Sequence, residues 1–85
     1  MPATKIGKLK RGQYVRVRWV DSCAHSGWHT PHGKPRVSKI ESIGMIGSVS
    51  DTAIEIIGDI DRAHGDINRV MSIPRACVIS VKVIG

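Results

Sequence analysis

The stretch from Trp19 to His32 concentrates the side chains best suited to chemistry, with both tryptophans of the chain and three of its four histidines. An indole ring offers a flat face on which a nucleobase can stack, while hydroxyl and imidazole groups can hydrogen-bond to a phosphate or a ribose. Arginine can pair with a phosphate through two parallel hydrogen bonds. These types predict a pocket for a phosphate-bearing ligand, with ligand-binding candidates Arg16, Arg18, Asp21, Ser22, His25, Trp28, His29, Lys34, Arg36 and Arg75.

Three of the aromatic and basic residues each have a structural alternative. Trp19 lies in phase with Val15 and Val17, so a place in the core is expected. Trp28 follows a glycine in a polar stretch, where it either anchors the loop to the domain or stacks on a ligand. Arg75 either contacts a phosphate or carboxylate, or packs its aliphatic stem over apolar neighbours.

Metal binding has to be weighed for Cys23, His25, His29 and His32, which are ligand types that zinc prefers. Their spacing fits no standard zinc finger and no second cysteine pair follows. Histidines in contact with solvent are therefore the preferred interpretation, and we expect no metal site.

Catalysis would require a nucleophile held against a base. Ser22 and Cys23 lie close to His25 in the sequence, but neighbours on a loop reach a productive geometry only within a rigid surrounding. A chain of 85 residues supplies little of that. We expect neither enzymatic activity nor a cofactor.

Length and composition predict one small domain spanning residues 1–85, because a chain this short buries a single thin core. Twelve isoleucines and nine valines, against one leucine and no phenylalanine, favour strands over helices. The apolar runs are too short for a membrane span or a signal peptide, and two cysteines are too few for a disulfide scaffold. We therefore expect a cytoplasmic protein that does not enter a membrane.

The basic charge is concentrated in the first half of the chain. The net charge is +6, and residues 1–41 hold nine basic side chains against two acidic ones, a net +7. Residues 42–85 hold four basic and five acidic side chains. Such asymmetry favours an anionic partner, a small nucleotide or a nucleic acid, because clustered cations concentrate phosphates. The alternative is a solvated basic face that only keeps the domain soluble.

Alternating hydrophobicity predicts an all-β domain of five short strands, at residues 14–20, 37–49, 53–60, 69–73 and 78–83. Gly44 and Gly47 are expected to bend the second strand, and Pro74 to end the fourth. Residues 1–12 are expected to form a basic N-terminal arm outside the core, and residues 21–36 a long functional loop. Closure into a small curved barrel would limit the exposed strand edges.

Two stretches resemble SH3-type barrels. Residues 72–78, Ser-Ile-Pro-Arg-Ala-Cys-Val, are similar to the strand, one-turn 3₁₀ helix and strand that end such domains. Residues 10–17, Lys-Arg-Gly-Gln-Tyr-Val-Arg-Val, resemble their opening strand. The resemblance implies a five-stranded SH3-like curved barrel with a 3₁₀ turn before the last strand.

The chain is also similar to small phage-encoded proteins of unassigned activity. They share a Val-x-Trp-x-Asp-Ser strand end, a Gly-Trp in the following loop and an Ile-Pro-Arg near the C-terminus, found here at residues 17–22, 27–28 and 73–75. The resemblance implies an accessory factor acting in the cytoplasm of an infected host cell. Such factors include inhibitors of host defence that bind a nucleic acid, a host protein or a nucleotide signal.

Three functions remain open on these grounds. The favoured one is a non-catalytic phage-type binding protein that captures a phosphate-bearing ligand, a nucleotide immune signal sequestered to inhibit host defence. The alternative is a nucleic-acid-binding SH3-like barrel with a regulatory or inhibitory role. The third is a protein-interaction or virion module. A thin core leaves strand edges in need of cover, so a homo-oligomer is expected.

Overall fold

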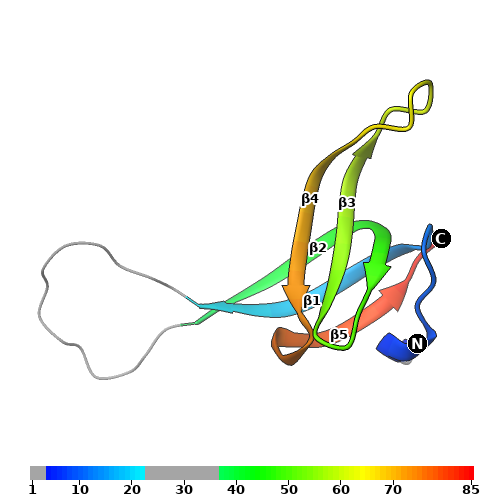
Figure 1. Ribbon diagram of the computed structural model, residues 1–85. Helices are drawn as coiled ribbons and strands as arrows, with labels where there is room; N and C mark the ends of the chain where they lie inside the picture. Colours follow the sequence, from blue (N-terminus) through cyan, green and yellow to red (C-terminus); the bar gives the residue numbers. More distant parts are fainter. Residues whose placement is uncertain (1–3, 23–36) are drawn as a thin grey trace, which may run out of the picture.

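Antiparallel strands make up most of the chain in the computed structural model, which describes residues 4–22 and 37–85. Five strands form one sheet in the order β4-β3-β2-β1-β5, which confirms the all-β class (Figure 1). Among the described residues, no helix has the length and apolar character needed to cross a membrane. The elements in chain order are η1 (Ile6–Lys8), β1 (Tyr14–Ser22), β2 (Val37–Val49), β3 (Ala53–Ile60), β4 (Ile67–Pro74), η2 (Arg75–Cys77) and β5 (Val78–Val83).

The predicted strands agree with most of these bounds. β2, β3 and β5 begin and end where the alternation places them, and the 3₁₀ turn η2 precedes β5 as expected. β1 runs two residues further than predicted, because Asp21 and Ser22 still pair with Ser38 and Val37. β4 begins at Ile67 and includes Pro74, which an edge strand tolerates because one side of its backbone needs no ladder hydrogen bond.

The core is apolar and lies on one face of the sheet. The inward residues of β1 alternate as predicted, with Val15 and Val17 fully buried and Trp19 packed against the buried cluster. The Nε1 of Trp19 donates a hydrogen bond to the Ser42 hydroxyl at 3.0 Å, which satisfies the indole inside the sheet. The other members of the buried cluster are Leu9, Ile46, Ile54, Ile56, Ile73 and Val81.

The segment before β1 is not the arm outside the core that we expected. Leu9 is only 8% exposed within the core, and Ile6 packs against the same cluster. These two residues are three apart across η1, and a 3₁₀ turn places such residues on one side. Thr4 N also donates to Val81 O at 2.6 Å, so the segment lies along β5.

β2 bends at its two glycines, as predicted. Its first part, from Val37 to Met45, pairs with β1, and its last part, from Met45 to Val49, pairs with β3. The register with β3 shifts at Gly47, which is a β-bulge. Gly44 lies so close to β3 that a Cβ atom there would overlap the Ile56 side chain and lie 2.9 Å from the Ile57 carbonyl oxygen.

The expected barrel closure is not made. Among the described residues β4 and β5 form the two edges of one curved, open sheet, with η2 passing between them. The β3–β4 hairpin extends well beyond the rest of the sheet (Figure 1). Every side chain of β4 except Ile73 is exposed, so this strand has too little buried surface to hold it against β5.

Replacing Gly44 by alanine tests the close approach of β2 to β3. We expect Gly44→Ala to lower the free energy of unfolding by about 1 to 3 kcal/mol, because the added methyl overpacks against β3. The measurement is urea unfolding followed by circular dichroism. Gly7→Ala is the control, since a Cβ at Gly7 meets nothing within 4 Å and should change stability by less than about 0.5 kcal/mol. Equal stability of Gly44→Ala and the wild type would contradict the packing.

Candidate functional site

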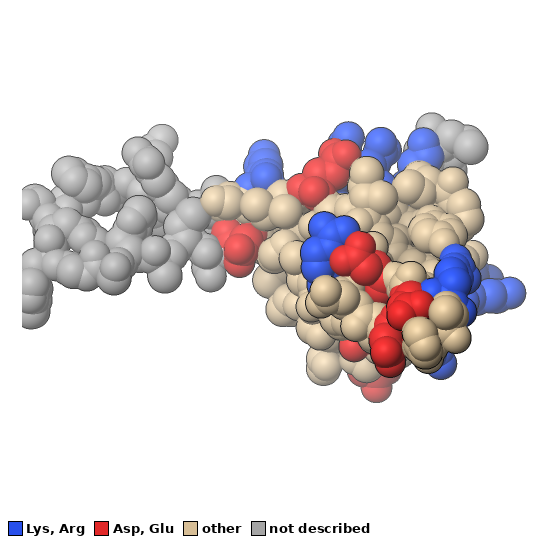
Figure 2. Space-filling model, turned by 90° about the horizontal axis from the view of Figure 1, so that it is seen from above, with Lys and Arg blue, Asp and Glu red and all other residues tan. Residues whose placement is uncertain are grey.

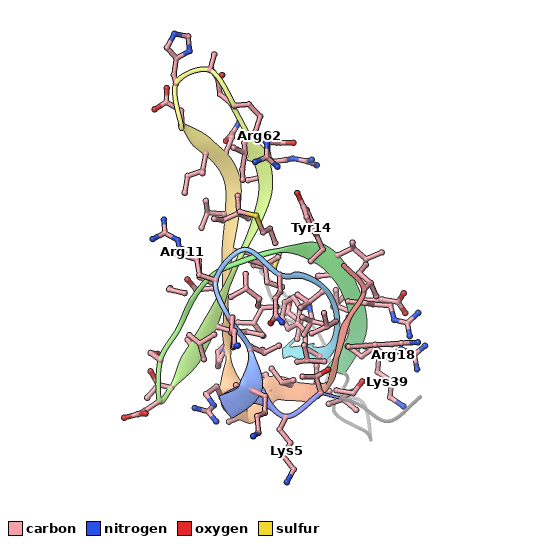
Figure 3. The ribbon with its side chains drawn as sticks, turned by 90° about the vertical axis from the view of Figure 1, so that its right-hand side faces the viewer. Lys5, Arg11, Tyr14, Arg18, Lys39 and Arg62 are labelled. Atoms are coloured by element: carbon pink, nitrogen blue, oxygen red, sulfur yellow. The ribbon has the colours of Figure 1, made fainter. Side chains whose placement is uncertain are left out.

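Four basic side chains share the outer face of β5, β1 and β2, opposite the core. Arg16 and Arg18 alternate with the buried valines of β1, so both point outward. Lys82 of β5 pairs with Arg16, and Lys39 of β2 pairs with Val20, which has the same orientation as Arg18. Figure 3 shows Arg18 and Lys39 on one side of the sheet. We refer to Arg16, Arg18, Lys39 and Lys82 as the basic face.

One carboxylate opposes these four cations. Arg18 Nε lies 3.3 Å from Glu41 Oε2, and both side chains are about half exposed. An exposed pair of this kind contributes little stability, so Arg18 can readily exchange Glu41 for another anionic partner. Within residues 4–22 and 37–85, Arg16, Lys39 and Lys82 form no ion pair, so the face keeps a surplus of three positive charges.

The acidic residues of the second half lie mainly on the β3–β4 hairpin, outside the three strands that carry the basic face. Arg69 donates to both carboxylate oxygens of Asp59, at 2.6 and 2.8 Å. Asp61 accepts hydrogen bonds from His64 Nδ1 at 3.0 Å and from Ala63 N at 2.9 Å. In Figure 2 acidic and basic side chains mix over this hairpin, which points toward the viewer, while basic side chains follow one side of the molecule.

These contacts lower the pKa of both aspartates. The hydrogen bond from Arg69 is the main cause for Asp59, assisted by the positive charge of the guanidinium. For Asp61 the hydrogen bond from His64 comes first, followed by that from the backbone of Ala63. The hairpin therefore neutralises Arg69 internally.

The sequence-predicted site residues are only partly brought together. Arg16 and Arg18 meet on the outer face, whereas alternation places Asp21 on the other face of β1 and Ser22 at its end, opposite Val37. The guanidinium of Arg75 donates to Ser50 O at 3.1 Å, and its backbone N–H to Thr52 O at 2.8 Å. Arg75 therefore ties η2 to the β2–β3 turn. The remaining candidates lie outside the described residues: His25, Trp28, His29, Lys34 and Arg36.

Sequence reasoning did not identify Lys39 and Lys82 as site residues. Lys82 lies between the inward residues Val81 and Val83, so the alternation alone could have placed it on the outer face. Lys39 joins the site only through the register of β1 with β2, in which it is opposite Val20.

An apolar row borders the basic face and was also missed. Tyr14 pairs with Met45, Met45 with Ile57 and Ile57 with Val70, while Ile84 N donates to Tyr14 O at the other end. Successive pairs place Tyr14, Met45, Ile57 and Val70 on the outer face, and Ile84 follows the inward Val83. Tyr14 is 43% exposed, whereas Ile57 is 6% exposed. We refer to Ile84, Tyr14, Met45, Ile57 and Val70 as the apolar row.

A shallow hollow of about 280 Å³ opens along this row. Tyr14, Met45 and Ile57 line it together with Arg62 and the end of β3, where Asp59 is held by Arg69. Arg62 Nη2 donates to the Tyr14 hydroxyl at 3.2 Å, and Figure 3 shows Tyr14 pointing away from the sheet toward Arg62. The phenol is thus held at its tip while its ring stays partly open to solvent.

No protein-family model, curated protein or solved structure matches this chain.

Substituting Arg69 tests the coupling within the hairpin. We expect Arg69→Gln to raise the pKa of Asp59 toward its ordinary value of 3.8, because the carboxylate loses its charged donor. The folded pKa lies below the unfolded one, so the pair stabilises the fold above the unfolded pKa, and this contribution is lost as pH falls through the folded pKa. The measurement is an NMR titration of the Asp59 side-chain carboxyl carbon between pH 2 and 6. Lys8→Gln is the control and should leave the midpoint unchanged; a similar shift there would contradict the specific contact.

Proposed function

We propose that this protein binds the phosphate backbone of a nucleic acid through the basic face. The observation that carries the proposal is the gathering of four cations on the outer face of three adjacent strands, with one carboxylate among them. Cations spaced along an exposed sheet suit an extended polyanion, since each can neutralise a separate phosphate and release its counterions.

We further propose that the fold is SH3-like. The strand order β4-β3-β2-β1-β5, with a strongly bent β2 and a 3₁₀ turn leading into β5, supports this assignment. Together with the resemblance to phage-encoded proteins, it favours a regulatory or inhibitory nucleic-acid-binding role.

Capture of a small nucleotide signal, favoured by the sequence, remains a separate prediction. It depends on Trp28 and the neighbouring histidines, which lie outside the described residues. A mononucleotide has too few phosphates to engage four cations spread over three strands. Competition by mononucleotides therefore distinguishes the two ligands, because only the nucleotide hypothesis predicts efficient displacement.

Neutralising the basic face should abolish most of the salt dependence of binding. We expect a variant combining Arg16→Gln, Arg18→Gln, Lys39→Gln and Lys82→Gln to bind a 20-nucleotide oligonucleotide far more weakly in 50 mM salt. Each lost phosphate contact flattens the plot of log affinity against log salt by about 0.7 to 0.9, so four contacts reduce the slope by about three. Fluorescence anisotropy between 50 and 300 mM salt measures both quantities.

A charge-matched control comes from the N-terminal segment. Lys5, Lys8, Lys10 and Arg11 carry the same charge, and Figure 3 shows Lys5 and Arg11 well away from Arg18 and Lys39. Replacing these four by glutamine lowers the net charge equally but should retain most of the slope. An equal loss in both variants would show that overall charge, and not the basic face, determines binding.

A further inference from the structure

Tyr14 lies on the same outward face of β1 as Arg16 and Arg18 of the basic face. Tyr14, Arg16 and Arg18 occupy alternate positions of β1 and therefore project from the same face at intervals of roughly 7 Å. Lys82 lies beside Arg16 on β5, and Ile84 lies beside Tyr14. An exposed aromatic ring thus borders two cations on neighbouring strands.

The ring is available for stacking and is held in place. Tyr14 is 43% exposed, and its hydroxyl accepts the hydrogen bond from Arg62. Met45 lies beside Tyr14 on β2 and Ile57 beside Met45 on β3, and the hollow that these three residues line provides space on the outer face. A phenol fixed at both its backbone and its tip loses little freedom when a second flat group packs against it.

Paired bases in a duplex are stacked inside the helix, where a residue on a sheet surface does not reach their flat faces. A single strand exposes those faces, and proteins bind it by combining aromatic platforms with a cationic groove or surface. An aromatic ring, apolar side chains and cations on one face suit a single-stranded nucleic acid, in which flat bases and anionic phosphates alternate along the strand.

We propose that the outer face binds single-stranded nucleic acid, with one base stacked on Tyr14 and adjoining phosphates at Arg16 and Lys82. This inference rests on the proposed function and specifies its substrate class. The apolar row recognises a base and the basic face the backbone, so the contact shows little sequence preference.

Tyr14→Leu and Tyr14→Phe test the stacking directly. Leucine keeps an apolar side chain without an aromatic face, and phenylalanine keeps the ring without the hydroxyl. We expect Tyr14→Leu to weaken binding of single-stranded DNA and RNA about tenfold, with the salt slope nearly unchanged, whereas Tyr14→Phe should stay within about threefold of the wild type. A hairpin duplex of equal charge should bind more weakly than the single strand and be insensitive to both changes.

Photocrosslinking of the wild-type protein provides a second measurement that does not depend on how a variant folds. Single-stranded DNA containing 5-bromouracil is irradiated with the protein, and tryptic peptides are identified by mass spectrometry. Trypsin releases residues 12–16, which contain Tyr14, separately from residues 19–36, which contain both tryptophans. We expect the main adduct in residues 12–16.

The outcomes separate this inference from the proposed function. Preference for the duplex, equal binding by Tyr14→Leu and wild type, or an adduct confined to residues 19–36 would overturn the stacking on Tyr14 while leaving binding through the basic face intact. Absence of binding to any oligonucleotide in 50 mM salt would overturn the proposed function itself.

Discussion

The close approach of β2 to β3 at Gly44 is the contact on which the rest of the sheet depends. Only a residue without a side chain lets β2 lie against Ile56 and Ile57 there, and the bulge at Gly47 completes the change of direction. One strand can therefore pair with β1 over its first part and with β3 over its last. The bend wraps both halves around a shared core and turns the opposite surface outward, where the basic face and the apolar row lie.

The sequence predicts those strands that have one buried face, because burial of one face requires apolar and polar residues to alternate along the strand. β2, β3 and β5 belong to this group. Asp21 near the far end of β1 and Asn68 in the first part of β4 are exposed, and no apolar alternation marks these stretches of the sequence. Leu9 was missed for a related reason, since one leucine in a basic segment carries no periodicity.

The candidate site was predictable only where it lies on a single strand. Arg16 and Arg18 follow from the alternation of β1. The pairing of Lys39 with Val20 depends on the register of β1 with β2. A short turn of known type lets a sequence predict such a register, but residues 23–36 separate these two strands. The place of Lys82 beside Arg16 depends on β5 joining β1 from the far end of the chain. Tyr14 follows from the same alternation as Arg16 and Arg18, but its place beside Met45 and Arg62 depends on the register of β2 and on the β3–β4 hairpin.

Because of Thr4, the two edges of the sheet differ in how readily they can pair with a further strand. Its backbone N–H donates to Val81 O, and its hydroxyl accepts from Val83 N at 3.4 Å, so a short piece of the chain already occupies the outer side of β5. Along this stretch β5 is closed to a second backbone, whereas β4, at the other end of the strand order, pairs only with β3 among the described strands. A further strand could join the sheet along Val81 to Val83 only by displacing Thr4.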